Sequence, residues 1–323
     1  QEWLWQVLAA LTNDLAGRVG LVALNAALVA GTLAAIYARL RLRLVAPMFA
    51  ALGAALALAN LGMYTEVRPF MVVGPMAAVY LIAFERYESG RNWRWLAALL
   101  PLQIAWANIH GSFLVGLALC GIFGAAASWE ARAWRSALPW AWTLVALTAA
   151  SLVNPLGAGL LRFTLFASRL PFNREYIAEW QAPDFASWSS APLLGCIVLT
   201  VCLLYMCRGW PRSKAQGLLL VACTLAGLYS RQFLVLYAVA AAPTLAEILF
   251  HAVGRPWRNE ISHVSALVLL LTAIILGLAV PGRRLQAQSY EQTVAKTYPV
   301  KALGFMRQAC LLYTSPSPRD RQK

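Results

Sequence analysis

Several polar residues near the ends of apolar segments are of the types that can bind a phosphate ester and take part in its reaction. A guanidinium group binds phosphate oxygens through paired hydrogen bonds and stays charged in a dry site. A carboxylate can accept the proton of an attacking hydroxyl, while arginine stabilises the charge that grows on a phosphate leaving group. This chemistry suits an anionic lipid head group, such as a lipid-linked phosphosugar. The candidates are Arg68, Asn108, His110, Glu179, Asp184 and Arg231.

The composition places these residues in a membrane protein. Of the 323 residues, 60% are hydrophobic and 12% are charged, and the mean hydropathy is +0.62. No soluble globular domain of this size carries so little charge. The 27 basic residues exceed the 13 acidic ones, but basic residues also collect on the cytoplasmic side of membrane proteins, so the excess does not predict nucleic-acid binding.

Several signatures of other function classes are missing. The six cysteines and three histidines show no zinc-binding spacing. The sequence also contains no phosphate-binding loop, no His-Glu-x-x-His and no Gly-x-Ser-x-Gly. These absences argue against a zinc enzyme, an ATP-driven pump and a serine hydrolase.

The elements that must position the candidates are apolar segments of membrane-spanning length. About 20 apolar residues cross a bilayer as a helix, and we predict an all-α polytopic bundle of about ten helices. We also expect an interfacial helix over residues 3–11 and one long polar loop over 157–190. The predicted segments are 19–38, 44–63, 69–84, 95–109, 112–129, 137–155, 191–208, 215–230, 232–250 and 263–281.

The distribution of Lys and Arg predicts which loops share a side of the membrane. Thirteen basic residues lie in one set of alternate loops, beginning with 39–43 and 86–94, and six lie in the other set. The positive-inside rule makes the first set cytoplasmic. All the candidates then lie on the external side, and we expect no comparable carboxylates or amides within the helices.

Each candidate also has a structural interpretation. Arg162, Arg169 and Arg174 fit side chains that extend to lipid head groups, whereas Arg68 and Arg231 fit a functional and a structural role equally well. His110 suits a helix-terminal cap or a polar turn. Glu179 and Asp184 could equally be solvated loop acids.

A series of short motifs resembles a group of bacterial polytopic proteins that look like relatives of the GT-C glycosyltransferases. That superfamily includes the protein O-mannosyltransferases and the lipid A aminoarabinose transferase. The resemblance spans nearly all of residues 1–309. The motifs are Glu2-Trp3-Leu4, Arg68-Pro69, Trp106-Ala107-Asn108-Ile109-His110-Gly111, Asn154-Pro155-Leu156-Gly157, Glu179-Trp180, Arg231 with Pro243, and Tyr298-Pro299.

The resemblance implies an enzyme of the bacterial inner membrane that takes a sugar from a polyprenyl-phosphate donor at the external, periplasmic face. Membrane lipids and an acceptor glycan, lipid or protein would be its partners. Arg68 and Arg231 would bind the donor phosphate, and Asn108 and His110 would line the site. Glu179 or Asp184 would contact the sugar, the acceptor or a divalent ion; no metal site or other cofactor is assigned.

The resemblance also bears on the catalytic base and the domain limits. GT-C enzymes usually carry the catalytic carboxylate in the first external loop. Glu2 matches at best the distal part of that loop, so we expect the principal Asp upstream of Gln1 and an inactive fragment. We assign 1–281 to a transmembrane domain truncated at its start and 282–309 to the beginning of an external domain. Residues 310–323 resemble a translated sequencing adapter.

Two other function classes stay open on the sequence. A transporter or flippase for a lipid-linked or anionic solute could use the same arginines as an entry site. Carriers tend to place polar or broken-helix sites at mid-membrane, for which Gln103 and the helix prolines are the candidates. An O-antigen ligase or polymerase would also use external Arg and His, although its large late external loop is not evident.

Overall fold

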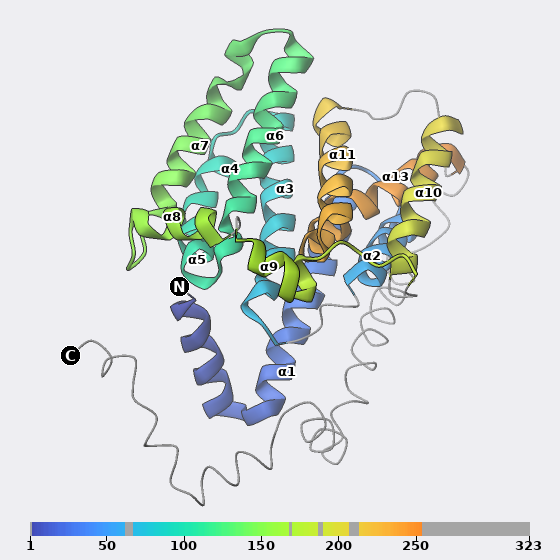
Figure 1. Ribbon diagram of the computed structural model, residues 1–323. Helices are drawn as coiled ribbons and strands as arrows, with labels where there is room; N and C mark the ends of the chain where they lie inside the picture. Colours follow the sequence, from blue (N-terminus) through green and yellow to red (C-terminus); the bar gives the residue numbers. More distant parts are fainter. Residues whose placement is uncertain (1, 62–66, 168–169, 187–189, 207–212, 254–323) are drawn as a thin grey trace, which may run out of the picture. The chain divides into compact units, whose positions relative to one another are not determined.

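The computed structural model describes residues 2–61, 67–167, 170–186, 190–206 and 213–253, and every regular element in them is helical (Figure 1). The α-helices are α1 (Trp3–Leu42), α2 (Pro47–Leu61), α3 (Val73–Gly90), α4 (Arg94–Ala97), α5 (Leu99–Ile109), α6 (Leu114–Ala131), α7 (Leu138–Ser151), α8 (Ala158–Ala167), α9 (Pro171–Tyr176), α10 (Ala191–Met206), α11 (Lys214–Tyr229), α12 (Leu234–Leu236) and α13 (Ala242–Val253). Short 3-10 turns include η1 (Pro69–Val72), η2 (Gly111–Phe113), η3 (Trp134–Ala137), η4 (Ala178–Trp180) and η6 (Arg231–Phe233), and η7 (Tyr237–Ala241) is a π-helix.

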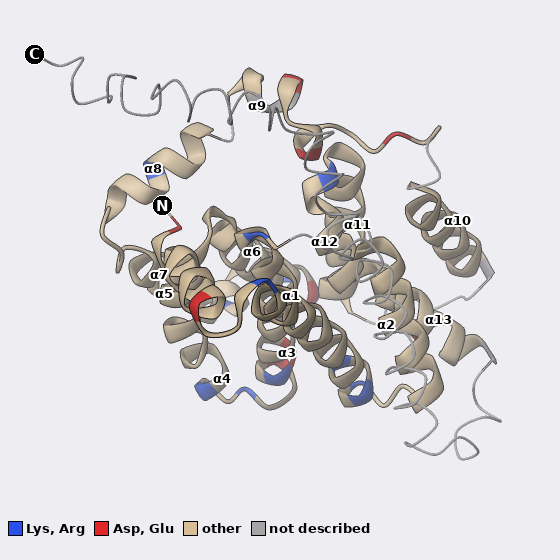
Figure 2. Ribbon diagram, turned by 90° about the horizontal axis from the view of Figure 1, so that it is seen from below, with Lys and Arg blue, Asp and Glu red and all other residues tan. Residues whose placement is uncertain are grey.

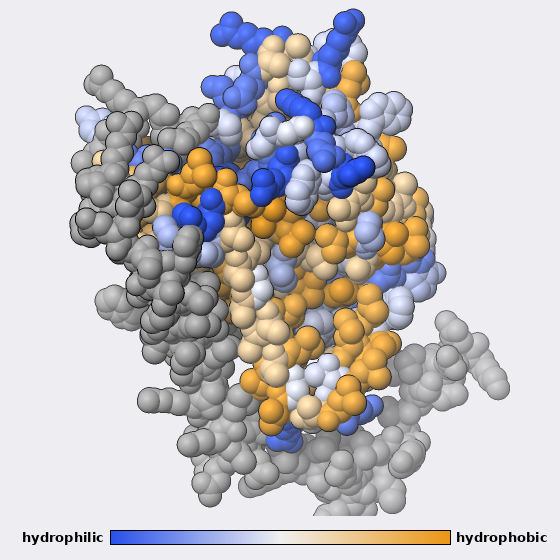
Figure 3. All heavy atoms as spheres, turned by 180° about the vertical axis from the view of Figure 1, so that it is seen from behind, coloured by the Kyte–Doolittle hydropathy of each residue, from blue (hydrophilic) through white to orange (hydrophobic). Residues whose placement is uncertain are grey.

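Four stretches of the described chain are long and apolar enough to cross a membrane. They are Trp3–Leu42, Pro69–Gly90, Gly111–Ala131 and Arg231–Ala252, and shorter apolar helices accompany them. Hydrophobic side chains also cover much of the exposed surface between the helix ends (Figure 3). Such a surface is costly in water and suits a lipid environment. The chain is therefore a helical membrane protein.

The predicted segments overlap helices, but four described helices are long enough to cross a membrane, so the count of about ten stays a prediction. The loop predicted over 157–190 contains the helices α8 and α9 and the turn η4. Each of the first nine overlaps a helix, although α2, α10 and α11 are shorter than a full span. The predicted segment 263–281, the external domain 282–309 and the tail 310–323 lie outside the described residues.

A sharp bend divides α1 into two arms (Figure 1). The bend is at Gly17, whose φ of 57° and ψ of −148° are almost exclusive to glycine. A Cβ at Gly20 would lie 2.7 Å from the carbonyl oxygen of Thr12, so a second glycine permits the close approach of the arms. The helix predicted over residues 3–11 thus continues to the bend, where the segment predicted over 19–38 begins.

Replacing Gly17 by alanine should lower the free energy of unfolding by about 1–3 kcal/mol, because the side chain makes this backbone conformation strained. Gly31→Ala is the matched control, since Gly31 lies within the same helix and has open space around it. This control should be neutral or stabilising. Unfolding in detergent micelles measures both changes, and equal effects would show that the bend imposes no strain.

The connections between helices gather at two ends of the bundle. At the basic end, Lys214 Nζ lies 4.9 Å from the Trp129 ring centre, and Arg43 pairs with Glu85. At the opposite end, the Ser230 hydroxyl donates to the carbonyl of Glu179 at 3.0 Å. Most of the other charged residues lie near helix ends or in connections (Figure 2). These contacts agree with the two loop sets predicted from Lys and Arg spacing.

A buried polar network fixes the turn between α5 and α6. The Gln103 amide on α5 donates to the Ser151 hydroxyl at 2.8 Å and to the Phe113 carbonyl at 3.3 Å. The Tyr80 hydroxyl donates to the Gln103 amide oxygen. Because Gln103 is fully buried, these bonds are costly to break. They hold the turn that carries His110.

Candidate functional site

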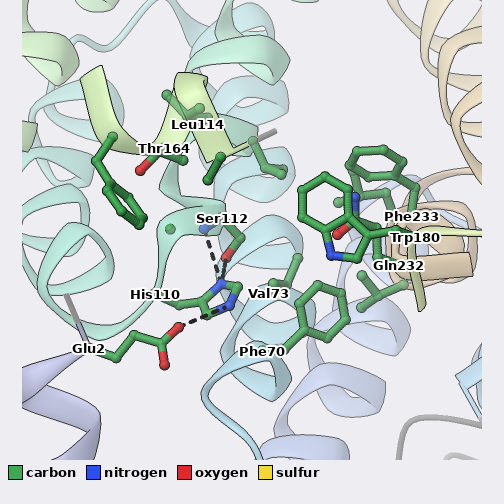
Figure 4. Close-up of a pocket in the computed structure, with 16 residues that line it drawn as sticks. Glu2, Phe70, Val73, His110, Ser112, Leu114, Thr164, Trp180, Gln232 and Phe233 are labelled. Atoms are coloured by element: carbon green, nitrogen blue, oxygen red, sulfur yellow. Dashed lines mark hydrogen bonds and ion pairs between the residues drawn. The ribbon is translucent and has the colours of Figure 1, made fainter. Parts of the chain in front are cut away.

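A cavity of about 280 Å³ lies at the end of the bundle opposite the basic end (Figure 4). Its walls come from the start of α1, from η1 and α3, from the α5–α6 turn, and from α8, η4, η6 and α12. Most of the lining is apolar; Glu2, His110 and Ser112 lie together, and Gln232 lies apart from them beside Trp180 and Phe233. The lining residues are Glu2, Phe70, Val73, His110, Gly111, Ser112, Leu114, Val115, Phe163, Thr164, Ala167, Trp180, Gln232, Phe233, Val235 and Leu236.

His110 is held in a defined orientation by the turn that follows α5. Its backbone is extended (φ −157°, ψ 148°), which ends α5 and starts η2. The Ser112 backbone N–H donates to Nδ1 of His110 at 3.0 Å, and the Ser112 hydroxyl lies 2.8 Å from the same nitrogen. Since Nδ1 accepts, the proton of the neutral ring is on Nε2. His110 is therefore a helix cap, one of the two structural roles considered for it, and the cap also orients its second nitrogen, Nε2.

The second nitrogen of His110 faces a carboxylate across the cavity wall. Nε2 lies 3.3 Å from Oε1 of Glu2, and Figure 4 shows the imidazole between Glu2 and Ser112. Burial lowers the pKa of His110 to about 4 and raises the pKa of Glu2. The imidazole is therefore neutral at pH 7, and the carboxylate is a stronger base than an ordinary glutamate.

Asn108 lies behind the cavity and joins α1, α5 and the chain after α7. Its Nδ2 donates at 2.8 Å to the carbonyls of Ile104 and Val153. Its Oδ1 accepts from the indole N–H of Trp3 at 2.7 Å. Asn108 is buried and is not among the lining residues. Its contacts place the start of α1, and with it Glu2, against the cavity.

The two arginines proposed for phosphate binding lie beside the cavity. Arg68 forms an ion pair with Glu179, and both side chains are partly exposed. The Arg231 backbone N–H donates to the Gln181 carbonyl at 2.9 Å, and its Nε donates to the Ala182 carbonyl at 3.2 Å. These two hydrogen bonds hold the segment that carries Trp180 against Arg231. Arg68, Glu179 and Arg231 do not line the cavity, although each is within two residues along the chain of a residue that does.

No family model, curated protein or solved structure matches the chain. The geometry of the chain itself is therefore the basis for assigning a function.

The remaining candidates do not meet at the cavity. Asp184 is exposed and accepts a hydrogen bond from the Ala186 backbone N–H at 3.0 Å, as in a loop turn. Arg162 is exposed on α8. Arg169 and the Arg174 side chain lie outside the described residues. Within the described chain, no three His, Cys, Asp or Glu side chains are grouped as a metal site.

Sequence reasoning missed two features. Ser112, Thr164 and Gln232 line the cavity. The proximity of Ser112 to His110 and of Gln232 to Arg231 was the available signal, and Thr164 had none. Trp180, from the motif Glu179-Trp180, also lines the cavity. The expectation that the helices lack carboxylates is wrong, because Glu247 within α13 is buried and pairs with Arg43 at 2.6 Å. Glu247 lies in a strongly apolar stretch, whose average hydropathy hides a single charge.

Proposed function

We propose that the protein is a membrane glycosyltransferase of the GT-C type. It transfers a sugar from a polyprenyl-phosphate donor to an acceptor hydroxyl at the external face of the bacterial inner membrane. The observation that carries the proposal is the Glu2–His110 pair at the edge of a largely apolar cavity. The spacing of Lys and Arg along the chain supports the external assignment.

The transfer needs a base. The resemblance places that base upstream of Gln1, but we propose Glu2 for the role instead, because its carboxylate lies 3.3 Å from His110 at the cavity. The acceptor oxygen attacks the anomeric carbon of the sugar, and the bond from that carbon to the phosphate oxygen breaks. The electron pair of that bond leaves with the lipid phosphate, and Glu2 takes the proton of the acceptor hydroxyl. His110 stays neutral and orients the carboxylate through its Nε2–H.

The leaving phosphate needs a cation and its lipid needs an apolar surface. Arg68 is two residues before the lining residue Phe70, and its guanidinium can exchange Glu179 for phosphate oxygens. The apolar walls from α3, α6 and α12 suit the first isoprene units of the donor. Arg231 contributes to the donor site indirectly, because it holds the loop that carries Trp180 in place.

An assay of donor turnover tests this proposal. Arg68→Ala should raise the donor KM by about 10–100-fold, because a charged hydrogen bond is worth about 1.5–3 kcal/mol. Arg135→Ala is the matched control, since Arg135 is exposed at the basic end, and it should leave KM unchanged. The readouts are release of polyprenyl phosphate and a covalent sugar product. Equal KM values for both variants would remove Arg68 from the donor site.

One observation favours a second candidate, a transporter or flippase of a lipid-linked solute. The last described span contains a π-helix beside buried Arg39 and Glu247, and carriers place binding sites at interrupted helices. Purified protein that moves the polyprenyl-phosphate sugar across a vesicle membrane without forming a covalent product would select the transporter.

A further inference from the structure

The last described span is interrupted by its own sequence. Pro243 has no backbone N–H, so the carbonyl of Val239 lacks the donor that residue i+4 supplies in an α-helix. The chain forms the π-helix η7 at this place. Nη1 of Arg39 donates to the Val239 carbonyl at 3.1 Å, which gives this buried carbonyl a donor that Pro243 cannot supply. A side chain 200 residues away along the chain thus supplies a hydrogen bond to the interrupted span.

Arg39 is held in place by a buried ionic cluster at the basic end of the bundle. Its Nε and Nη2 both lie 2.7 Å from Oε1 of Glu85 on α3. Arg43 contacts the same carboxylate at 2.7 Å and Glu247 on α13 at 2.6 Å. The Gln216 amide of α11 lies beside Glu247. The side chains of Arg39 and Glu247 are 4% and 2% exposed, and those of Arg43 and Glu85 are 15% and 19% exposed, so the cluster is largely buried.

The same span forms one wall of the cavity. Gln232, Phe233, Val235 and Leu236 line the cavity and immediately precede η7. A π-helix holds more residues per turn than an α-helix, and one residue corresponds to about 100° of rotation. If η7 became α-helical while α13 stayed fixed through Glu247, the residues before it would turn away from the cavity.

We infer that Arg39 is a positioning residue for the cavity. By donating to Val239 it maintains the π-helix, and the π-helix sets which side chains of η6 and α12 face the substrate. The cluster of Arg43, Glu85 and Glu247 fixes Arg39 and the far end of the span. The meaning for catalysis rests on the proposed function, whereas the coupling along the span does not.

Hydrogen exchange in the purified, lipid-reconstituted chain tests the coupling without any substrate. Lysine at position 39 keeps the charge for Glu85 but offers one ammonium in place of the branched guanidinium. Arg39→Lys should therefore speed amide exchange by 10-fold or more across 232–241 and leave α6 and α7 unchanged. Arg41→Lys is the control, because Arg41 donates to the nearby Val45 carbonyl, and it should leave 232–241 unchanged. Equal exchange in the two variants would overturn the inference.

A second substitution separates this role from a general contribution to folding. Pro243→Ala supplies the missing N–H, so Val239 no longer needs Arg39. On the Pro243→Ala background, Arg39→Lys should have little effect on exchange at 232–241, and rescue of a poorly folding Arg39→Lys chain would count equally in favour. Additive effects of the two substitutions, or a lack of rescue, would contradict the inference.

Donor kinetics extend the test to the proposed function. Arg39→Lys should raise the donor KM several-fold, because the side chains of η6 and α12 face the cavity less well. Exchange that changes as expected in a protein without donor turnover would retain the coupling and reject the glycosyltransferase. Donor turnover together with unchanged exchange at 232–241 in Arg39→Lys would retain the glycosyltransferase and reject the coupling.

Discussion

Replacing Glu2 by glutamine should lower kcat for sugar transfer by about 10²–10⁴-fold, the usual contribution of a general base. Glutamine keeps the size of the side chain and can still accept from Nε2 of His110, so the donor KM should change little. Single-turnover measurements with a polyprenyl-phosphate sugar separate the two parameters. Glu175→Gln is the matched control, since Glu175 is an exposed acid in the 170–186 segment, and its kcat should equal that of the wild type.

The pH dependence gives the same prediction a second readout. Glu2 must be ionised to accept a proton, and its pKa is raised by burial from 4.5. Transfer should therefore fall as pH decreases through this raised pKa, at a higher pH than for an exposed glutamate. The His110 pKa of about 4 keeps its ring neutral over that range, so the ring should add no second fall. An unchanged pH profile in Glu2→Gln would assign the base to another group.

Replacing Glu85 by leucine should lower the free energy of unfolding by about 3–5 kcal/mol, the cost of breaking a buried ion pair by removing one partner. The effect is large because Arg39 and Arg43 both lose a carboxylate at 2.7 Å. Denaturant or thermal unfolding in detergent micelles measures it. Glu130→Leu is the control, because Glu130 is exposed at the end of α6, and it should change stability by about 0.5 kcal/mol or less.

A combined replacement tests whether the loss comes from the unpaired arginines. Arg39→Met together with Glu85→Leu should cost less than the two single changes added together, since the double variant leaves one charge fewer without a partner. Additive losses would show that the pair does not act as a unit.

The sequence predicted the positions of the apolar helices. The length and apolar content of each segment make its helix predictable. Of the candidate site residues, Glu2 and His110 line the cavity, whereas Arg68, Asn108, Glu179, Asp184 and Arg231 do not. The turn at His110 was predicted from its place between two apolar segments. That Glu2 lies 3.3 Å from His110 could not be predicted, because the contact depends on the direction of α1 after the bend at Gly17. Spacing along the chain does not encode that direction.

Two assignments depended on side-chain contacts that a sequence pattern does not contain. Arg231 has the charge for phosphate binding, yet its Nε donates to the Ala182 carbonyl. Asn108 was proposed to line the site, yet its amide joins α1, α5 and the chain after α7. Pro243 belongs to one of the motifs, but the sequence does not show that the Val239 carbonyl, four residues before it, accepts from the distant Arg39. Local patterns identify polar residues, whereas packing determines which atoms they meet.

Site-specific photo-cross-linking shows whether the cavity binds a polyprenyl phosphate. The probe is a polyprenyl phosphate with a diazirine on its first isoprene unit, added to the chain in lipid nanodiscs. We expect adducts on cavity residues such as Phe70, Leu114 and Leu236, with competition by unlabelled polyprenyl phosphate and loss in Arg68→Ala. Adducts spread over the exposed apolar faces of α7 and α10, without competition, would contradict it.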